Sequence, residues 1–471
     1  MKSVSTRKLL QEDDLLQDFF STLDNLISEH AVQVHEHGFA VAYSGGLDSS
    51  VLLRLAYEFG KAKCIKVYAL HINHGLSPNA DAWQAFCLSI ATALDIPFFA
   101  SSVHVDGRSG LGLEASARRL RYAALGLLCE ELSIPLILTA HHQDDQAETL
   151  LLQLSRGTGI AGLSGMSASY LAPNLLSRNN IRLARPLLEK SKTVLVKFAK
   201  DFAIDFVNDE SNADFRFARN AIRHRVMPIF DEIAPDFANL LSRTAQHAQA
   251  AQNLLQELGE IDWQRCKEGN ALKVAEILGL SLNRIDNLFR FWISFHGLKM
   301  PTTARLIEIR RQLLYASDDA CISILHDGFV FRRYQGQVIL EPVLKKPFAA
   351  NESFSFAWNG EAFLEFPLFN GRIRFEPSVT GVDPNWLRLQ RLSIQLRNGG
   401  ERIRLGKNRP SRDIKHQFQY LKIPFWRRSI LPFVYAGGTL FFVAEVGIDG
   451  EFQTTGSHDL INLRWEFIAE H

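Results

Sequence analysis

Short apolar runs alternate with longer amphipathic segments over the first 200 residues of the chain. Four runs have the length and apolar density of buried strands, at 39–43, 65–70, 97–103 and 134–140. Apolar residues recur at helical spacing in the neighbouring segments, at 15–27, 80–93 and 113–132. Strands that alternate with helices predict an α/β fold, a parallel doubly wound sheet with helices on both faces.

The pattern changes after this region. Residues 236–316 keep helical periodicity almost throughout, whereas alternating and aromatic residues dominate from Cys321 onward. Turn-rich stretches at 206–216 and 345–352 interrupt the pattern. We therefore predict three domains: an α/β domain over 1–215, a mainly helical domain over 216–345 and a small β-rich domain over 346–471.

Composition limits the class of protein. Hydrophobic residues make up 46% and charged residues 22% of the 471-residue chain, as in globular proteins. No apolar run reaches the length of a membrane span, so no membrane partner is expected. The five cysteines include no C-x-x-C pair, which argues against a zinc or disulfide framework and favours a reduced compartment, by default the cytoplasm.

Charge is unevenly distributed, although the formal net charge is only +1. Residues 386–428 hold twelve Lys or Arg and two Asp or Glu, a net charge of +10, with aromatic residues among them. A solvated surface usually mixes both signs of charge. This concentration therefore suggests an anionic partner held by the carboxyl-terminal end of the chain.

Polar clusters follow three of the predicted strands. Residues 44–49, Ser-Gly-Gly-Leu-Asp-Ser, lie between a strand and a helix. Glycine lets the backbone approach a ligand closely and a helix start offers unpaired N–H groups, so this turn favours phosphate, although an ordinary strand-to-helix turn is the alternative. The other clusters lie at 71–77 and 141–149. Because ligands bind beyond the carboxyl ends of parallel strands, we expect one common site.

The hexapeptide SGGLDS resembles the signature of the PP-loop ATP pyrophosphatases, which split ATP between its α- and β-phosphates. A Walker A loop, G-x-x-x-x-G-K-[ST], is not matched. Further motifs are similar to those of the tRNA(Ile)-lysidine synthetase family within this superfamily, and 397–447 resembles that family's last domain. The motifs are HINHGLS at 71–77, EASARRLRY at 114–122, AHHQDDQAET at 140–149, RGTG at 156–159, RPLL at 185–188 and RNAIRHRVMP at 219–228.

The resemblance implies a fold and a reaction. A PP-loop catalytic domain would be followed by a helical domain that contacts tRNA and a β-rich domain that binds it. O2 of the wobble cytidine, C34, would attack the α-phosphate of ATP and release pyrophosphate. The side-chain amine of L-lysine would then displace AMP at C2. The resulting lysidine would let tRNA(Ile) with a CAU anticodon read AUA as isoleucine.

The resemblance assigns ATP to the phosphate loop and the second polar cluster. The expected ATP-binding residues are Ser44, Gly45, Gly46, Leu47, Asp48, Ser49 and His71. Asp48 would hold Mg²⁺ beside the phosphates or orient the loop, and it is also placed to cap the following helix.

The expected catalytic residues are Asp48, Arg121, His141 and Asp145. Arg121 would face phosphate, although an arginine on such a helix is usually solvated, and His141 would lie beside the reacting base. Asp145 and Glu148 share one helix face and would bind lysine, with helix capping as the alternative. The group that takes the proton from the attacking amine is left open.

Five arginines are expected to contact tRNA: Arg219, Arg223, Arg402, Arg404 and Arg412. The expected partners are therefore ATP, Mg²⁺, L-lysine and tRNA(Ile). A homodimer is retained as an option, with the oligomeric state left open.

Two rival functions belong to other classes. Another PP-loop tRNA-modifying enzyme, such as a thiolase, would normally use paired cysteines, which this chain lacks. A non-catalytic RNA-binding protein with a relic ATP fold would not need SGGLDS and the downstream clusters intact.

Overall fold

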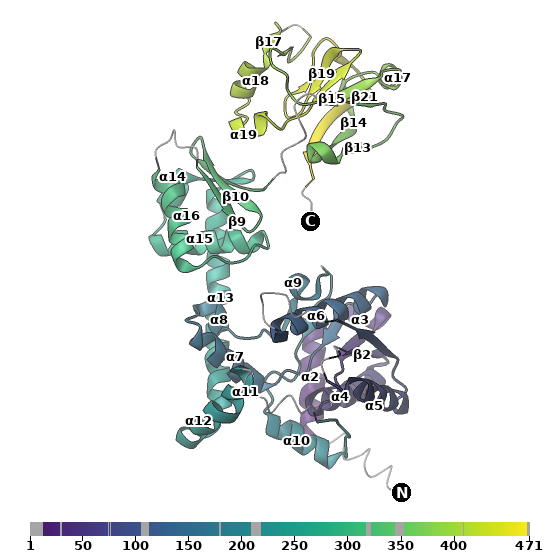
Figure 1. Cartoon of the computed structure of the whole chain (residues 1–471), viewed down its shortest axis with the longest axis vertical. Coiled ribbons are helices and arrows are strands. Elements are labelled where there is room, and N and C mark those ends of the chain that lie inside the picture. Colours follow the sequence, from purple (N-terminus) through teal and green to yellow (C-terminus); the bar gives the residue numbers. More distant parts are fainter. Residues whose placement is uncertain are drawn as a thin grey trace. The chain divides into compact units, whose positions relative to one another are not determined.

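The structure is a computed structural model, and the chain divides into two compact units, Met1–Leu258 and Gly259–His471 (Figure 1). Each unit is described by itself. The residues that the structure describes are 13–28, 31–73, 75, 77–104, 113–178, 180–208, 218–316, 322–343, 353–407 and 409–468.

A six-stranded sheet forms the centre of the first unit. Its strands are β1 (Phe39–Ala42), β2 (Val67–Asn73), β3 (Phe98–Ser102), β4 (Leu136–Leu138), β5 (Ser169–Leu171) and β6 (Arg182–Ala184). They follow the order β3-β2-β1-β4-β6-β5, and all neighbours are parallel except β5 and β6. The chain leaves β1 toward β2 on one side and later returns to β4 on the other. The carboxyl ends of β1 and β4 therefore flank a topological switch point, where open α/β sheets bind ligands.

Helices cover both faces of this sheet. They are α2 (Asp14–Ile27), α3 (Ala31–His37), α4 (Leu47–Lys63), α5 (Ala80–Ala93), α6 (Leu113–Glu131), α7 (Gln143–Ser155), α8 (Ile160–Leu163), α9 (Pro173–Leu176) and α10 (Lys192–Asp201). Phe39 and Val41 of β1 belong to the core with α2, α4 and α10. Ala40, between them, belongs to the core with α6 and α9 on the opposite face. Successive side chains of β1 therefore point into two apolar layers, one on each face of the sheet.

A short helical segment packs against the start of the long helix α13 (Phe237–Cys266). It consists of α11 (Ala218–Ala221), the π-helix η3 (Ile222–Val226) and α12 (Met227–Ile233). Met227 and Leu241 share a small core with Ala147 and Leu150 of α7. This core fixes 218–226 beside the amino-terminal end of α7, which carries the third polar cluster.

The second unit begins with helices on a five-stranded sheet. Its helices are α14 (Val274–Leu278), α15 (Leu282–Phe295) and α16 (Thr303–Tyr315), and its strands are β7 (Lys267–Glu268), β8 (Ala271–Lys273), β9 (Ser323–His326), β10 (Phe329–Tyr334) and β11 (Gln337–Pro342). The expectation of helix almost throughout 236–316 missed the hairpin of β7 and β8. Gly269 turns this hairpin with φ of +59°, and β8 pairs with the distant β11.

The rest of the second unit is β-rich. It contains β12 (Phe354–Phe356), β13 (Phe363–Phe366), the 3₁₀ turn η4 (Pro367–Phe369), β14 (Gly371–Gly381), α17 (Pro384–Arg388), β15 (Leu392–Gln395), β16 (Arg402–Ile403), β17 (Arg412–Asp413), α18 (Ile414–Tyr420), α19 (Phe425–Arg428), β18 (Phe433–Ala436), β19 (Thr439–Val443), β20 (Gly447–Ile448) and β21 (Thr454–Phe467). The sheets β12-β15-β18-β19-β20 and β13-β14-β21 share one core with Phe418 and Phe433.

The predicted fold class is confirmed: a parallel doubly wound domain, a largely helical segment and a β-rich carboxyl-terminal region follow one another. The domain boundaries at 215 and 345 remain predictions, and most of 206–216 and 345–352 lies outside the described residues. In the described part of the chain, no helix is long and apolar enough to cross a membrane. Cys64, Cys87, Cys129 and Cys266 are free thiols, and Cys321 lies outside the described residues.

Candidate active site

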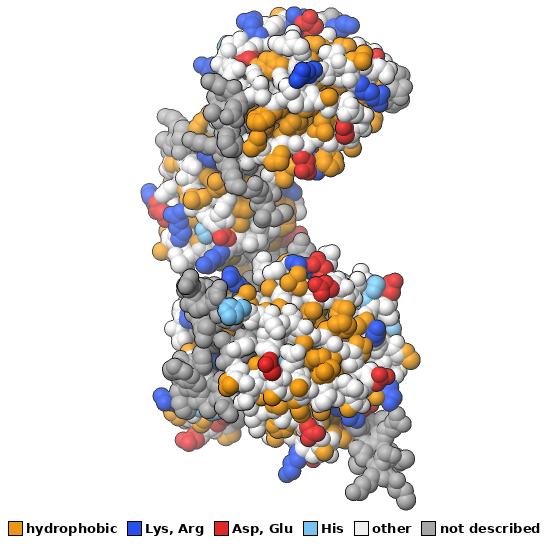
Figure 2. Space-filling model, turned by 45° about the vertical axis from the view of Figure 1, so that its right-hand side comes forward, with side chains coloured by type: hydrophobic (Ala, Val, Ile, Leu, Met, Phe, Trp, Pro, Cys, Tyr) orange, Lys and Arg blue, Asp and Glu red, His pale blue; other side chains and the backbone are white. Residues whose placement is uncertain are grey.

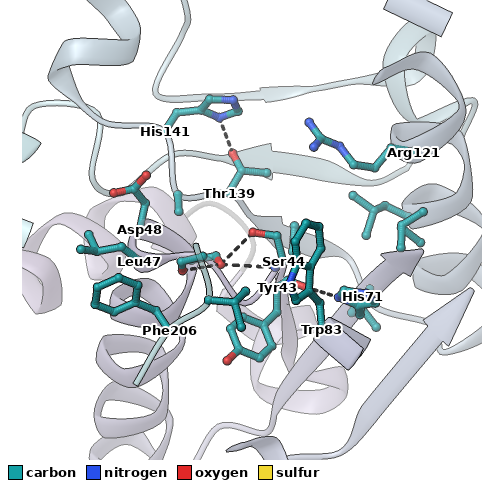
Figure 3. Close-up of a pocket in the computed structure, with 18 of the residues that line it drawn as sticks. Tyr43, Ser44, Leu47, Asp48, His71, Trp83, Arg121, Thr139, His141 and Phe206 are labelled. Atoms are coloured by element: carbon teal, nitrogen blue, oxygen red, sulfur yellow. Dashed lines mark hydrogen bonds between the residues drawn. The ribbon is translucent and has the colours of Figure 1, made fainter. Parts of the chain in front are cut away.

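A cavity of about 660 Å³ opens at the switch point of the parallel sheet (Figure 3). The ends of β1, β2 and β4 contribute to its wall, together with the start of α4 and one face of α6. Most of the predicted ATP and catalytic residues line it: Ser44, Gly46, Leu47, Asp48, Ser49, His71, Arg121 and His141. The three polar clusters therefore meet at this end of the sheet, as their positions after the strands predicted.

The phosphate loop is held by its own hydroxyl groups. The Ser49 hydroxyl donates to the Gly46 carbonyl at 3.0 Å and lies 3.0 Å from the Ser44 hydroxyl. Gly45 has φ of +84°, and a Cβ there would lie 2.8 Å from the Cys87 sulfur. Helix α4 begins at Leu47 without a side-chain cap. Its first N–H groups are thus available to an anion, as the sequence predicted, while the serine hydroxyls brace the loop.

His71 lies on β2 at the cavity wall and is buried. Its Nδ1–H donates to the carbonyl oxygen of Tyr43 at 2.9 Å, and its ring stacks on Phe98. Trp83, Tyr122 and Phe206 also line the cavity; Tyr122 ends the motif EASARRLRY, whereas no motif pointed to Trp83 or Phe206. Aromatic walls of this kind suit a planar base.

Arginines surround one side of the cavity. Arg121 of α6 has no carboxylate partner in the described part of the chain, and its guanidinium lies 5.5 Å from the centre of the Tyr122 ring. Burial, followed by the charges of Arg118 and Arg219, lowers the pKa of Arg121. A partly buried cation without a counter-charge favours an anionic ligand. Figure 3 shows Arg121 and His141 on the same side of the cavity as Thr139.

His141 belongs to this basic side. Its Nδ1 lies 3.0 Å from the Thr139 hydroxyl and 3.3 Å from Nε of Arg185. Burial lowers the pKa of His141 well below its ordinary value, and the charges of Arg185, Arg118, Arg219 and Arg121 act in the same direction. His141 is therefore a neutral imidazole near pH 7.

The next residue, His142, belongs to an acidic side. Its ring nitrogens lie 3.4 Å from Asp144, 3.4 Å from Asp145 and 3.6 Å from Asp48, and only 1% of its side chain is exposed. Burial disfavours its charged form, but the surrounding carboxylates outweigh burial and raise its pKa to about 10. His142 is therefore an imidazolium that joins the phosphate loop to the start of α7.

Asp48 has one oxygen toward His142 and one without a partner. Burial alone would raise the pKa of Asp48, but His142, Lys192 and Arg223 lower it, so Asp48 is ionised. Its Oδ1 is buried and accepts no hydrogen bond from any described residue. An orphaned carboxylate oxygen beside a phosphate loop fits one ligand of a Mg²⁺ ion whose other ligands come from phosphate and water. The described residues contain no cluster of three or more metal-binding side chains.

Asp145 and Glu148 meet the arginines of the segment 218–226. Arg219 donates to Glu148 at 2.7 Å and to Asp145 at 2.9 Å. Arg223 donates through Nε to one Glu148 oxygen at 2.5 Å and through Nη2 to the other at 3.0 Å. The structure thus pairs the two predicted lysine-binding carboxylates with two predicted tRNA-binding arginines.

The three carboxyl-terminal arginines lie in the second unit. Arg402 and Arg412 are exposed on the hairpin of β16 and β17, whereas Arg404 lies 3.4 Å from Glu451. Lys and Arg side chains project from this region on the face drawn in Figure 2. Of the aromatic residues interleaved among the basic ones, Phe418 is part of the core and Trp426 donates to Glu341 at 2.5 Å. The exposed basic residues, not these two rings, are available to an anionic partner.

Sequence reasoning missed His142, Arg185 and Lys192. His142 and Arg185 were inside quoted motifs, AHHQDDQAET and RPLL, without a role of their own. Lys192 lines the cavity, and its backbone N–H donates to Asp144 at 2.9 Å. Arg185 and Lys192 contact residues of other elements, and His142 also contacts the distant Asp48. For His142 and Arg185, the only sequence signal was an unassigned charged residue inside a motif.

A parallel sheet whose first strand runs through SGGLDS into an uncapped helix defines a PP-loop nucleotide-binding protein, and a model described as the PP-loop domain matches residues 15–230. Models described as the TilS substrate binding domain and the TilS substrate C-terminal domain match 272–339 and 392–465. The chain belongs to the tRNA(Ile)-lysidine synthase family.

Several relatives carry that name. The tRNA(Ile)-lysidine synthase of Burkholderia pseudomallei is 37% identical over 442 residues, which cover 87% of this chain and 89% of that one. The tRNA(Ile)-lysidine synthase of Ralstonia nicotianae is 37% identical over 431 residues, 89% of this chain and 90% of that one. Among solved structures, the U34-tRNA thiolase NcsA from Methanococcus maripaludis with its [4Fe-4S] cluster is 14% identical, with a TM-score of 0.41, over 50% of this chain and 80% of that one.

Proposed function

We propose that this protein ligates L-lysine to C2 of the wobble cytidine of tRNA(Ile) with a CAU anticodon and converts ATP to AMP and pyrophosphate. The observation that carries the proposal is the family relationship over almost the whole chain, together with an uncapped phosphate loop in the cavity. The product is lysidine, which makes the tRNA read AUA as isoleucine.

The first step uses the basic side of the cavity. The cytosine O2 attacks the α-phosphate, and the bond from that phosphorus to the bridging oxygen of pyrophosphate breaks. The N–H groups at the start of α4 hold the leaving pyrophosphate, and Arg121 neutralises charge on the α-phosphate. Because both reactants are held in place, alignment and charge neutralisation supply most of the rate.

The second step uses the acidic side. The ε-amine of lysine attacks C2, and AMP leaves with the former O2 of cytosine. Asp145 and Glu148 bind the α-ammonium of lysine, because a carboxylate beside the reacting amine would keep that amine protonated. Arg219 and Arg223 donate three hydrogen bonds to Glu148 here, so lysine would share this carboxylate with the arginines or displace one of them.

Mg²⁺ fits the cavity through Asp48. The unpartnered Oδ1 of Asp48 would contact the ion, with the phosphate oxygens of ATP as its other ligands. A bound Mg²⁺ would supply charge neutralisation at the phosphates. The His142 imidazolium orients Asp48 from the other side.

The remaining partners follow from surface charge and family. Arg402, Arg404 and Arg412, with Arg219 and Arg223, supply contacts to tRNA phosphates. The cytoplasm is the expected compartment. The homodimer stays a prediction that the mass of the protein in solution would test.

The rival functions have less support. A sulfur transfer normally needs paired cysteines, and the sequence contains no C-x-x-C. A relic binding protein would not keep Arg121 partly buried without a carboxylate beside the phosphate loop.

The test is direct. Purified protein is incubated with ATP, Mg²⁺, labelled lysine and a tRNA(Ile) transcript with a CAU anticodon, and the nucleosides are identified by mass spectrometry. We expect labelled lysidine at position 34, and no label on a transcript with C34 replaced by uridine. Release of AMP without incorporation of lysine would contradict the proposal.

A further inference from the structure

Arg185 is a buried arginine whose motif, RPLL, has no role in the mechanism described so far. It directly follows β6, and only 4% of the residue is exposed. Its Nη1 donates to the Ser167 carbonyl at 2.6 Å, and its guanidinium lies 5.3 Å from the centre of the Tyr170 ring. In the described part of the chain it has no carboxylate partner. Its remaining polar contact is to His141.

The contact with His141 has only one chemically allowed direction. A guanidinium has donors and no acceptor, so Nε of Arg185 donates and Nδ1 of His141 accepts, at 3.3 Å. An accepting Nδ1 carries no proton. The Thr139 hydroxyl lies 3.0 Å from the same nitrogen, and because an unprotonated Nδ1 has one in-plane lone pair, it shares that acceptor with Arg185. In the neutral ring the single proton must then reside on Nε2.

The charges around His141 keep it neutral. Arg118 and Arg121 act on it from α6, Arg219 from α11 and Arg185 from the end of β6. Burial and these four cations oppose a second proton on the ring. The hydrogen bond to Arg185 and the charge of its neighbours therefore favour the same single state.

We infer that Arg185 is a positioning residue that fixes His141 as the Nε2–H tautomer, so that His141 offers the cavity a hydrogen-bond donor and not a base. For the reaction, this inference rests on the proposed function. The acceptor is an oxygen of the reacting groups, either O2 of cytosine or an oxygen on the α-phosphate. The proton that leaves the lysine amine goes to another group.

The tautomer can be read without any activity. The full-length protein is labelled with ¹⁵N-histidine, and long-range ¹H–¹⁵N spectra are recorded between pH 6 and 8, with His141→Gln to assign the signals. We expect a protonated Nε2 and an unprotonated Nδ1 throughout this range. A proton on Nδ1, or a doubly protonated ring at pH 7, would overturn the inference.

Variants test the role of Arg185. Arg185→Gln removes the charge and should lower kcat at least tenfold, with KM for ATP and lysine changed less than threefold and a new dependence of kcat on pH below 7. Arg182→Gln, at the start of β6, should leave kcat unchanged. Arg185→Lys keeps a cationic donor and should recover part of the rate. An increase in KM for both ATP and lysine, with no change in the pH profile of kcat, would contradict a positioning role.

A third comparison tests whether His141 acts as a hydrogen-bond donor or as a base. Gln at position 141 places an amide N–H near the position of Nε2 but cannot take up a proton. His141→Gln should therefore retain far more lysidine formation than His141→Ala. Equal inactivity of the two variants would assign His141 the role of a base. If neither variant nor the parent forms lysidine while the spectra show the Nε2–H tautomer, the proposed function fails and the inference about Arg185 stands.

Discussion

His141 and His142 are adjacent in the chain, but His141 lines the cavity whereas His142 lies buried among Asp48, Asp144 and Asp145. His141 is surrounded by arginines, which together with burial hold its pKa well below the ordinary value. His142 is surrounded by Asp144, Asp48 and Asp145, which overcome burial and raise its pKa to about 10. Two identical side chains thus differ in charge because different elements supply their neighbours.

The contrast divides the cavity by chemistry. The basic side, with Arg121 and a neutral His141, suits the phosphates of ATP and the adenylated base. Asp145 and Glu148 form the acidic side, which suits an ammonium group, although they are paired with Arg219 and Arg223 and do not line the cavity. His142 compensates part of the acidic charge and helps to keep Asp48 ionised. A two-step reaction with an anionic and then a cationic substrate requires such a division.

The largest expected effect comes from Asp48, where the two sides meet. Asp48→Ala should lower pyrophosphate release by about 10³-fold or more, because it removes the proposed Mg²⁺ contact and a partner of His142. Binding of tRNA, measured by filter retention, should stay within a few fold. Glu58→Gln on the same helix is the control. Near-normal turnover of Asp48→Ala would remove Asp48 from the mechanism.

His142→Gln should lower the free energy of unfolding of the protein. It leaves three carboxylates without their shared cation, at a cost of about 3–5 kcal/mol in the free energy of unfolding. Because the pKa of His142 is raised from 6.5 to about 10, its stabilisation is complete below pH 6.5 and lost as the pH rises toward 10. The difference from the parent should shrink by about 1.4 kcal/mol per pH unit between these values.

The measurement is denaturant unfolding of parent and variant without Mg²⁺, which would itself bind near Asp48. His37→Gln, at an exposed position on α3, is the control. A difference that stays constant from pH 6.5 to 10 would show that His142 is not a stabilising cation.

Arg121→Gln should impair only the first step, which depends on the basic side. Removal of the partly buried guanidinium should slow formation of the adenylated tRNA about 10²-fold, because its charge acts where negative charge develops. Arg119→Gln, exposed on the same helix, should have no effect. Equal rates for the two variants in single-turnover assays would return Arg121 to a structural role.

Glu148→Gln should impair only the binding of lysine, which depends on the acidic side. A lost charged hydrogen bond is worth about 1.5–3 kcal/mol, so KM for lysine should rise roughly 10- to 100-fold while KM for ATP stays constant. Titration of both substrates at saturating tRNA gives the two constants. An unchanged KM for lysine would assign Glu148 to holding Arg219 and Arg223.

The smallest effect is expected in the second unit. Arg412→Gln should weaken tRNA binding by about 1 kcal/mol and reduce the slope of affinity against salt by about one. Arg374→Gln, whose side chain lies 3.3 Å from Glu466, is the control. Equal salt slopes for the parent and Arg412→Gln would exclude a phosphate contact by Arg412.

The local pattern of apolar residues predicted many of the helices and strands. The helix predicted at 80–93 has those bounds, and the strand predicted at 39–43 ends one residue early. Both depend on periodicity within one segment. The hairpin at 267–273 was missed because β8 pairs with β11, more than sixty residues later, and tertiary pairing outweighed helical periodicity.

The sequence predicted the location of the site but not the contacts between its side chains. Motifs at strand ends gathered Asp48, His71 and His141, because parallel strands share one carboxyl edge. Pairing of Glu148 with Arg223, 75 residues later, and of Arg185 with His141, 44 residues earlier, depends on how the segments pack. For His141 such distant contacts set the charge, whereas His142 owes its charge both to the distant Asp48 and to Asp144 and Asp145, two and three residues later.

The division of the cavity is tested most directly in a single turnover without lysine. Parent, Glu148→Gln and Arg121→Gln are mixed with ATP, Mg²⁺ and tRNA(Ile), and adenylated tRNA is followed before and after lysine is added. We predict that the parent and Glu148→Gln form the adenylate at similar rates and differ only when lysine is added, whereas Arg121→Gln fails at the first step. Equal loss of the adenylate in Glu148→Gln and Arg121→Gln would contradict the division.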